Sequence, residues 1–224
     1  MTESQAGAAA PRNMSVAEAF DVVEPFMVPT LLARRAEAEH TLIVETRDRY
    51  DFGLATSLAV ALLIGSRAVA PSDQHDIVCL APCQRQAKIF LKSVIEKCKE
   101  ILAEHSIDSK IVVLGKNLSI TLQHSDGSMT KIICISPTKA NMRGVYADEW
   151  IMWETEWMDA ECCVNIYVAA LMKKGVNVTA FFGRNGSPIV REKMMSGEGV
   201  VIYDRREKRL ADEPEERPKR TKSK

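Results

Sequence analysis

The sequence predicts an α/β protein with a mostly parallel sheet and helices on both of its faces. Short, β-branched apolar segments alternate with longer helical segments, which is the pattern of strand–helix units in parallel sheets. The 224 residues are 46% hydrophobic and 27% charged, enough for one large domain with tails. A glycine-bearing turn between the first strand and an apolar helix has the architecture of a phosphate-binding loop.

The first elements expected are two short helices, a strand and a buried helix. Ser15 is a candidate N-cap for the first helix, and a second is expected over residues 25–35. Residues 40–45 form a short apolar strand, and the turn TRDRYDFG (46–53) follows it. The helix over 54–65 is apolar on every face, which predicts that it lies inside the domain.

The middle of the chain predicts a strand over 76–81 and a helix over 84–104 with one apolar stripe. The dipeptide Asp126-Gly127 between two strand segments is a strong β-hairpin signal. We expect this hairpin to be an insertion or an edge of the sheet. The strands of this region are expected at 110–115, 118–123 and 129–136.

The second half of the chain predicts a strand over 149–153, then Glu154, then a helix over 155–174. An apolar strand that ends in an acidic residue presents a carboxylate at the carboxyl edge of a parallel sheet. The last strands are expected at 176–182 and 200–203.

Charge and apolar content exclude several classes of function. The formal net charge is +0, so any contact with nucleic acid must come from a local patch. No apolar run approaches the roughly 18 residues that a membrane-spanning helix needs, and the N-terminus lacks the pattern of a secretory signal. The six cysteines have no paired metal-ligand spacing. We therefore expect buried, reduced thiols in an intracellular protein, no metal held by cysteine or histidine, and no membrane contact.

The order of elements over residues 40–188 resembles the ATPase domain of the viral terminase large subunit, the DNA-packaging motor of tailed phages and herpesviruses. The most specific part includes the turn SDGS, the loop KIICISPTKANMRG, the strand ending at Glu154, the strand VNVTAFF and then Asn185-Gly186. The resemblance implies a P-loop NTPase-like fold of the terminase ATPase type. It implies Glu154 as the catalytic residue, and Arg143, Asn185 and Gly186 as coupling residues. The implied partners are other terminase or capsid-portal proteins and viral DNA.

Three polar parts of the family's site are apolar in this chain. Gly53 precedes Leu54-Ala55, where the family carries Gly-Lys-Ser/Thr, so the phosphate-binding lysine and a magnesium ligand are missing. The family's magnesium-binding Asp falls on Trp153. Residues 181–183, Phe-Phe-Gly, stand where the coupling motif has hydroxyl residues. We therefore expect Mg-ATP to bind weakly or not at all.

Two alternatives would restore parts of that site. Arg47 or Arg49 would replace the missing lysine, and Thr56 the missing hydroxyl, although one step along a helix turns a side chain by about 100°. A second register places the acidic pair on Asp148-Glu149. That register leaves only three residues for the preceding strand, and strands usually need about five. We favour the register that ends at Glu154.

Ordinary structural roles compete with these functional ones. Glu154 at a helix start would favour the helix dipole without any catalysis, and Arg143 in a loop is more often a solvated charge. Three tryptophans have the spacing of one helix face, which would pack in the core or bind a partner: Trp150, Trp153 and Trp157.

Both ends of the chain are expected to lack fixed structure. Residues 1–14 are small and polar, and residues 204–224 are too charged to pack, so the folded domain is expected over 15–203. The basic end of the tail resembles a nuclear import signal, which leaves the host nucleus open as a location.

Three functions follow from these observations. The first is a terminase-like protein of viral DNA packaging that has lost hydrolysis or keeps it weakly, either as a degenerate relative or as one part of a split terminase. The second is a working motor ATPase in which an arginine replaces the lysine and Asp148-Glu149 supply the metal site. The third is a protein that has kept only the fold and binds an unrelated partner.

Overall fold

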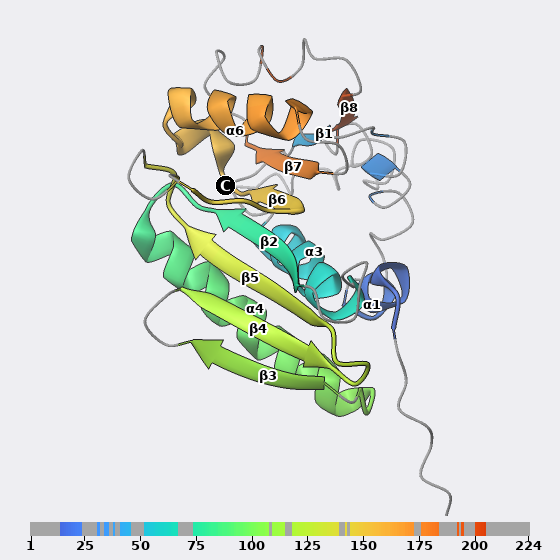
Figure 1. Ribbon diagram of the computed structural model, residues 1–224. Coiled ribbons are helices and arrows are strands. Elements are labelled where there is room, and N and C mark those ends of the chain that lie inside the picture. The colour runs from blue at the N-terminus through green and yellow to red at the C-terminus, as the bar shows by residue number, and fades with distance from the viewer. Residues whose placement is uncertain are drawn as a thin grey trace, which may run out of the picture.

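An eight-stranded sheet with the order β3-β4-β5-β2-β6-β7-β1-β8 runs through the molecule (Figure 1). Every neighbouring pair from β5 to β8 is parallel, whereas the β3–β4 and β4–β5 pairs are antiparallel. The predicted mostly parallel sheet is confirmed, and the predicted hairpin, β4–β5, lies near one edge. The strands are β1 (Thr41–Glu45), β2 (Gln74–Leu80), β3 (Ser109–Leu114), β4 (Ser119–His124), β5 (Met129–Ile135), β6 (Glu149–Met152), β7 (Asn177–Phe182) and β8 (Val200–Asp204).

This computed structural model describes most of the region predicted to fold. The described residues are 14–23, 31, 34–35, 38, 41–45, 52–66, 74–107, 109–114, 118–138, 142, 144–172, 176–183, 192, 194 and 200–204. The predictions for both tails and for most of the helix at 25–35 lie outside them. At the described limits, Met14 is buried and Asp204 ends β8. Within these ranges no helix is long and apolar enough to cross a bilayer.

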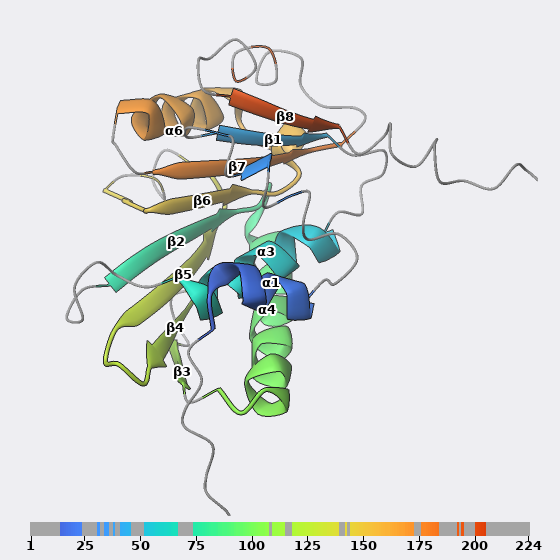
Figure 2. The same cartoon turned by 90° about the vertical axis from the view of Figure 1, so that its right-hand side faces the viewer.

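Helices cover both faces of the sheet (Figures 1 and 2). On one face α3 (Phe52–Gly65) and α4 (Gln84–Glu104) pack against the strands, and α1 (Val16–Val23) packs on α3. On the other face lies α6 (Ala160–Met172). Side chains of a strand point alternately to the two faces. Ile151 of β6 therefore packs in the core beside α3 and α4, and Met152 packs in the core beside α6.

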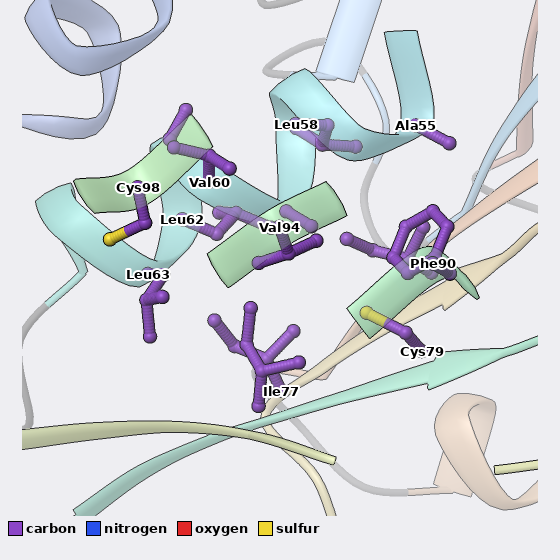
Figure 3. Close-up of a cluster of buried hydrophobic side chains, with 14 of the residues drawn as sticks. Ala55, Leu58, Val60, Leu62, Leu63, Ile77, Cys79, Phe90, Val94 and Cys98 are labelled. Atoms are coloured by element: carbon purple, nitrogen blue, oxygen red, sulfur yellow. The ribbon is translucent and has the colours of Figure 1, made fainter. Parts of the chain in front are cut away.

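The uninterrupted apolar sequence of α3 is explained by its position between α1, α4 and the sheet. Every residue from Leu54 to Ile64 is buried. Figure 3 shows the packing around Leu58 of α3, Val94 of α4 and Ile77 of β2. At its last residue, Gly65, a Cβ atom would lie 2.3 Å from the backbone of Val16. This glycine is required because α1 crosses α3 in direct backbone contact.

The predicted cap and hairpin turn are both present. Ser15 Oγ accepts a hydrogen bond from the Glu18 amide (3.2 Å), and Glu18 Oε2 accepts one from the Ser15 amide (2.8 Å). This reciprocal pair is a capping box, and it fixes the start of α1. In the β4–β5 turn Gly127 has a φ of +85°, which glycine adopts without steric cost.

The helix predicted over 155–174 is wrong at its start. A 3₁₀ turn, η1 (Thr155–Trp157), comes first, and α6 begins only at Ala160. Asp159 Oδ1 accepts a hydrogen bond from the Cys162 amide (2.9 Å), which caps this later start. The three tryptophans therefore do not share a helix face: one lies in β6, one directly after it and one in η1.

Candidate functional site

The candidate site lies at the carboxyl ends of the parallel strands, where α/β folds of this kind bind ligands. Strand β2 leads there into α4 through residues 81–83, and β6 leads into Trp153 and Glu154. The amide of Trp153 donates to the carbonyl of Leu80 (2.9 Å), so the β2–β6 pairing extends to this point. Glu154 thus lies at the carboxyl edge of the sheet, as predicted.

Three aromatic rings from three elements meet at this edge. Phe52 is the first residue of α3, Phe90 lies in α4, and Trp153 follows β6. The Phe52 and Trp153 centroids are 5.0 Å apart in an edge-to-face arrangement, and the Phe52–Phe90 and Phe90–Trp153 distances are 5.7 Å and 6.0 Å. Trp153 is only 8% exposed. We call these three residues the aromatic cluster, and it joins the start of α3 to the end of β6.

Glu154 has an unusual backbone conformation and a specific partner. Its φ and ψ are 52° and 49°, in the left-handed region that costs a residue with a side chain about 1–2 kcal/mol. Its carboxylate accepts a hydrogen bond from Gln86 Nε2 (2.7 Å), in the first turn of α4. Gln86 Oε1 in turn lies 3.3 Å from the Cys83 thiol. The turn after β6 therefore directs the Glu154 carboxylate toward the start of α4.

The start of α3 presents few polar side chains to this edge. Gly53 is exposed, and a Cβ there would meet nothing within 4 Å. Leu54 and Ala55 are buried in the core, and so is Thr56, whose hydroxyl has no hydrogen-bond partner among the described residues. The alternative role for Thr56 as a ligand at the crevice therefore gains no support from its position.

A partly buried polar bridge between α3 and α4 was not predicted. Lys97 Nζ donates to Ser57 Oγ (2.9 Å), and Ser57 Oγ donates to the Gly53 carbonyl (2.8 Å). The bridge brings an ammonium group against α3, one turn inside its first residues. The sequence did carry a signal for it. Lys97 follows Phe90 by seven residues and Val94 by three, so it borders the apolar stripe of α4, whereas the other lysines of this helix lie on the opposite face.

Asp148 and Glu149 lie at the amino end of β6, opposite the candidate site at the carboxyl ends of the parallel strands. Glu149 is the first residue of β6, and its buried carboxylate pairs with Arg35 and accepts a hydrogen bond from Asn177 Nδ2 (3.1 Å). Asp148 Oδ2 accepts a hydrogen bond from the Asp76 amide (3.0 Å). The register that placed the catalytic acidic pair here is wrong, because these carboxylates support the amino ends of the strands.

The remaining predicted site residues lie outside the described part of the chain. They are Arg47 and Arg49 of the turn before α3, Arg143 of the loop before β6, and Asn185 and Gly186 after β7. Gly144, which follows Arg143, is described and has a φ of +74°, a conformation that favours glycine.

The described residues do not fit a metal centre. They contain no group of three or more His, Cys, Asp or Glu side chains that could hold an ion. At the carboxyl ends of β2, β6 and β7, the described side chains offer one carboxylate, Glu154.

Five cysteines are buried and free, and burial raises the pKa of the Cys98 and Cys163 thiols to about 12. Cys83 is the exception to the predicted burial, because it is exposed just before α4.

The architecture is an α/β fold with a mostly parallel sheet, and it is similar to the fold of solved large terminase ATPase domains. The ATPase domain of the Thermus phage P74-26 large terminase has a TM-score of 0.63 and 17% identity, covering 85% of this chain and 86% of that one. The large terminase of bacteriophage HK97 has a TM-score of 0.58 and 12% identity, covering 85% and 44%. The large terminase of a thermophilic bacteriophage, in complex with ADP, has a TM-score of 0.56 and 9% identity, covering 86% and 45%.

The chain thus matches less than half the length of the last two terminases. No protein-family model matches the sequence, and no curated protein matches it either. Identities this low show a terminase-like fold and leave the activity to be argued from the site.

Proposed function

We propose that this chain is a terminase-like component of viral DNA packaging in which ATP hydrolysis is lost or weak. The observation that supports it most is the contact between Phe52 and Trp153, 5.0 Å between ring centroids. In the register that ends at Glu154, Trp153 occupies the position of the magnesium-binding Asp. The apolar rings therefore lie between the two elements that would hold the phosphates and the metal.

Electrostatics explains why Leu54, Ala55 and Trp153 would lower the rate of ATP hydrolysis. Phosphoryl transfer depends almost entirely on positioning and on stabilising the charge of the transition state. Leu54 and Ala55 are buried and apolar where a lysine and a hydroxyl would act, and Trp153 adds no charge. Glu154 is the one described carboxylate at the carboxyl ends of β2, β6 and β7, and it accepts a hydrogen bond from Gln86. A general base without charge stabilisation supports little turnover.

The proposed partners are other terminase or capsid-portal proteins and viral DNA, inside an infected cell and, given the basic tail, in the host nucleus. In this proposal the domain contributes its fold to the packaging assembly, and other subunits supply the hydrolysis. Co-purification of the full chain with packaging proteins, but not with an unrelated host protein, separates this role from the alternative in which the protein has kept only the fold and binds an unrelated partner.

The direct test is phosphate release by the purified full chain with Mg-ATP. We expect a rate equal to that of the Glu154→Gln variant, which removes the candidate base while retaining the shape of the side chain. A fast magnesium-dependent rate, far above a buffer blank, that this variant abolishes would overturn the proposal. It would favour a working motor in which Arg47 or Arg49 replaces the phosphate-binding lysine.

A further inference from the structure

Two of the buried cysteines lie side by side on neighbouring parallel strands. Cys79 of β2 is the register partner of Cys134 of β5. Both side chains belong to the core beside α3 and α4, where they are only 2% and 1% exposed. Successive side chains of a strand alternate between the two faces, so two register partners in the same core point the same way. We call Cys79 and Cys134 the thiol pair.

The two thiols of the pair are close enough to affect each other. Burial raises the pKa of the Cys134 thiol well above its usual value, and the Cys79 thiol raises it further through a hydrogen bond and through its charge. The thiolate is the form that reacts with oxidants. The raised pKa therefore keeps Cys134 protonated and slow to react, which suits a thiol that stays reduced until an oxidant is abundant.

The spacing of the two strands is close to that of a disulfide. Neighbouring strands lie about 4.7–4.9 Å apart, and a disulfide joins Cα atoms that are about 4.4–6.8 Å apart. The Cβ atoms of a disulfide are about 3.5–4.5 Å apart, so β2 and β5 would have to approach slightly at this point. A disulfide formed here would be mildly strained, and strained disulfides are readily reduced again.

The other four cysteines lack this arrangement in the described structure. Cys98 of α4 belongs to the same core, but Figure 3 shows it at the opposite end of the view from Cys79. Cys162 and Cys163 are consecutive residues of α6, and a helix turns consecutive side chains about 100° apart. Cys83 is exposed and lies outside the core. The thiol pair is thus the one set of described cysteines that the fold arranges for a cross-link.

The thiol pair lies next to the candidate site. Leu80, the residue after Cys79, accepts a hydrogen bond from the Trp153 amide (2.9 Å). The next amide, that of Ala81, donates to the carbonyl of Ile135 (3.1 Å), which continues the β2–β5 pairing. A disulfide at the pair would therefore fix β2 to β5 directly before the strand end that holds Trp153.

We propose that Cys79 and Cys134 are a reversible redox pair, which hydrogen peroxide oxidises to a disulfide between β2 and β5. One sulfur attacks a peroxide oxygen and the O–O bond breaks, which leaves a sulfenic acid and releases one water. The second sulfur attacks the sulfenic sulfur, the S–O bond breaks, and a second water leaves with the thiol proton. Two thiols and one peroxide thus give one disulfide and two waters, and a dithiol reductant restores both thiols.

This redox pair does not rest on the proposed function. Phosphate release by the chain would overturn the proposed loss of hydrolysis and would leave the redox pair unchanged.

The first test identifies the cross-link in the full chain carrying Cys83→Ser, which removes the exposed thiol. After peroxide treatment the free thiols are alkylated in urea, and the chain is digested with trypsin without reduction. Mass spectrometry should find peptide 68–85 joined to peptide 132–139, and dithiothreitol applied to the folded protein should prevent this product. Cys98 should remain a free thiol. Oxidation of Cys83 in wild-type chain treated alongside shows that the peroxide was active.

The second test is the melting temperature before and after peroxide. In the Cys83→Ser chain, the disulfide should raise it by about 4–16 °C. Adding Cys134→Ala should abolish the rise, whereas adding Cys98→Ala should retain it. These two variants are matched, because each removes a buried thiol from the same core.

Several results would overturn the redox pair. One is that Cys79 and Cys134 are still free thiols when Cys83 of the wild type is fully oxidised. Another is that they become sulfinic or sulfonic acids, or join other cysteines, in place of a disulfide with each other. A disulfide that dithiothreitol reduces only in urea would also contradict reversibility. If the Cys134→Ala variant does not fold, the peptide analysis of the Cys83→Ser chain decides alone.

Discussion

The ring of Phe52 meets the ring of Trp153 edge to face, with 5.0 Å between their centroids. The contact ties the first residue of α3 to the end of β6, and Phe90 of α4 packs against both rings. In the function proposed above, these are the two elements that would hold phosphates and magnesium. Here they are joined by apolar contacts, so this part of the sheet contributes to the core.

The aromatic cluster predicts that Trp153 stabilises the fold strongly. Trp153→Ala removes a buried indole and leaves a cavity between α3 and α4, and such changes typically cost about 3–5 kcal/mol. The free energy of unfolding from urea titration measures the loss. Trp157→Ala is the matched control, because Trp157 is 53% exposed and its removal should cost far less. Equal losses at the two positions would contradict the packing described.

The left-handed backbone of Glu154 predicts an inverted order for alanine and glycine. Both Glu154→Ala and Glu154→Gly lose the hydrogen bond from Gln86, but only glycine adopts this conformation without strain. We expect the glycine variant to be more stable than the alanine variant by about 1–2 kcal/mol.

The control for this comparison is Ala103→Gly on the exposed side of α4. There the ordinary helical order should hold, with glycine less stable by about 1 kcal/mol. If alanine is also preferred at position 154, the turn after β6 does not have the conformation described.

The sequence predicted the sheet and most of the helices, because strands and helices leave different periodicities. It also located Glu154, since an apolar strand before an acidic residue is a local pattern. The partner of that carboxylate was not predictable, because Gln86 lies 68 residues earlier and only the fold brings the two together. The late start of α6 was not predicted for a similar reason. Trp153 is buried beside α3 and α4, and the chain turns at Glu154 directly after it. Local helix propensity does not depend on such packing.

Two glycines of α3 should respond oppositely to alanine. Gly65→Ala places a Cβ 2.3 Å from backbone atoms of Val16, so α1 must shift, at a cost of about 1–3 kcal/mol. Gly53→Ala meets open space, and its φ is not in the positive range that disfavours alanine. Reduced freedom of the unfolded chain should stabilise this variant by about 0.4–1 kcal/mol. Urea titration of both variants checks the signs, and a neutral Gly65→Ala would mean that α1 does not cross α3 this closely.

The position of Arg85 predicts that its removal stabilises the protein. A cation in the first turn of α4 opposes the helix dipole, so Arg85→Gln should raise the free energy of unfolding by about 0.3–1 kcal/mol at low salt. The gain should shrink in high salt because the charges are screened. Lys99→Gln, away from either helix end, should change stability little. A loss of stability in Arg85→Gln would show that this arginine has a structural role in the fold.

Nucleotide binding can be tested separately from turnover by the melting temperature. A competent site with ATP at about 100 times its dissociation constant would stabilise the fold by roughly 2.7 kcal/mol, which is about 5–10 °C for a domain of this size. We expect a much smaller shift with Mg-ATP, because Leu54, Ala55 and Trp153 offer neither charge nor metal ligands at the crevice. ATP with a chelator, and magnesium alone, are the controls. A shift of the full size that requires both magnesium and ATP would show that residues outside the described part of the chain complete a nucleotide site.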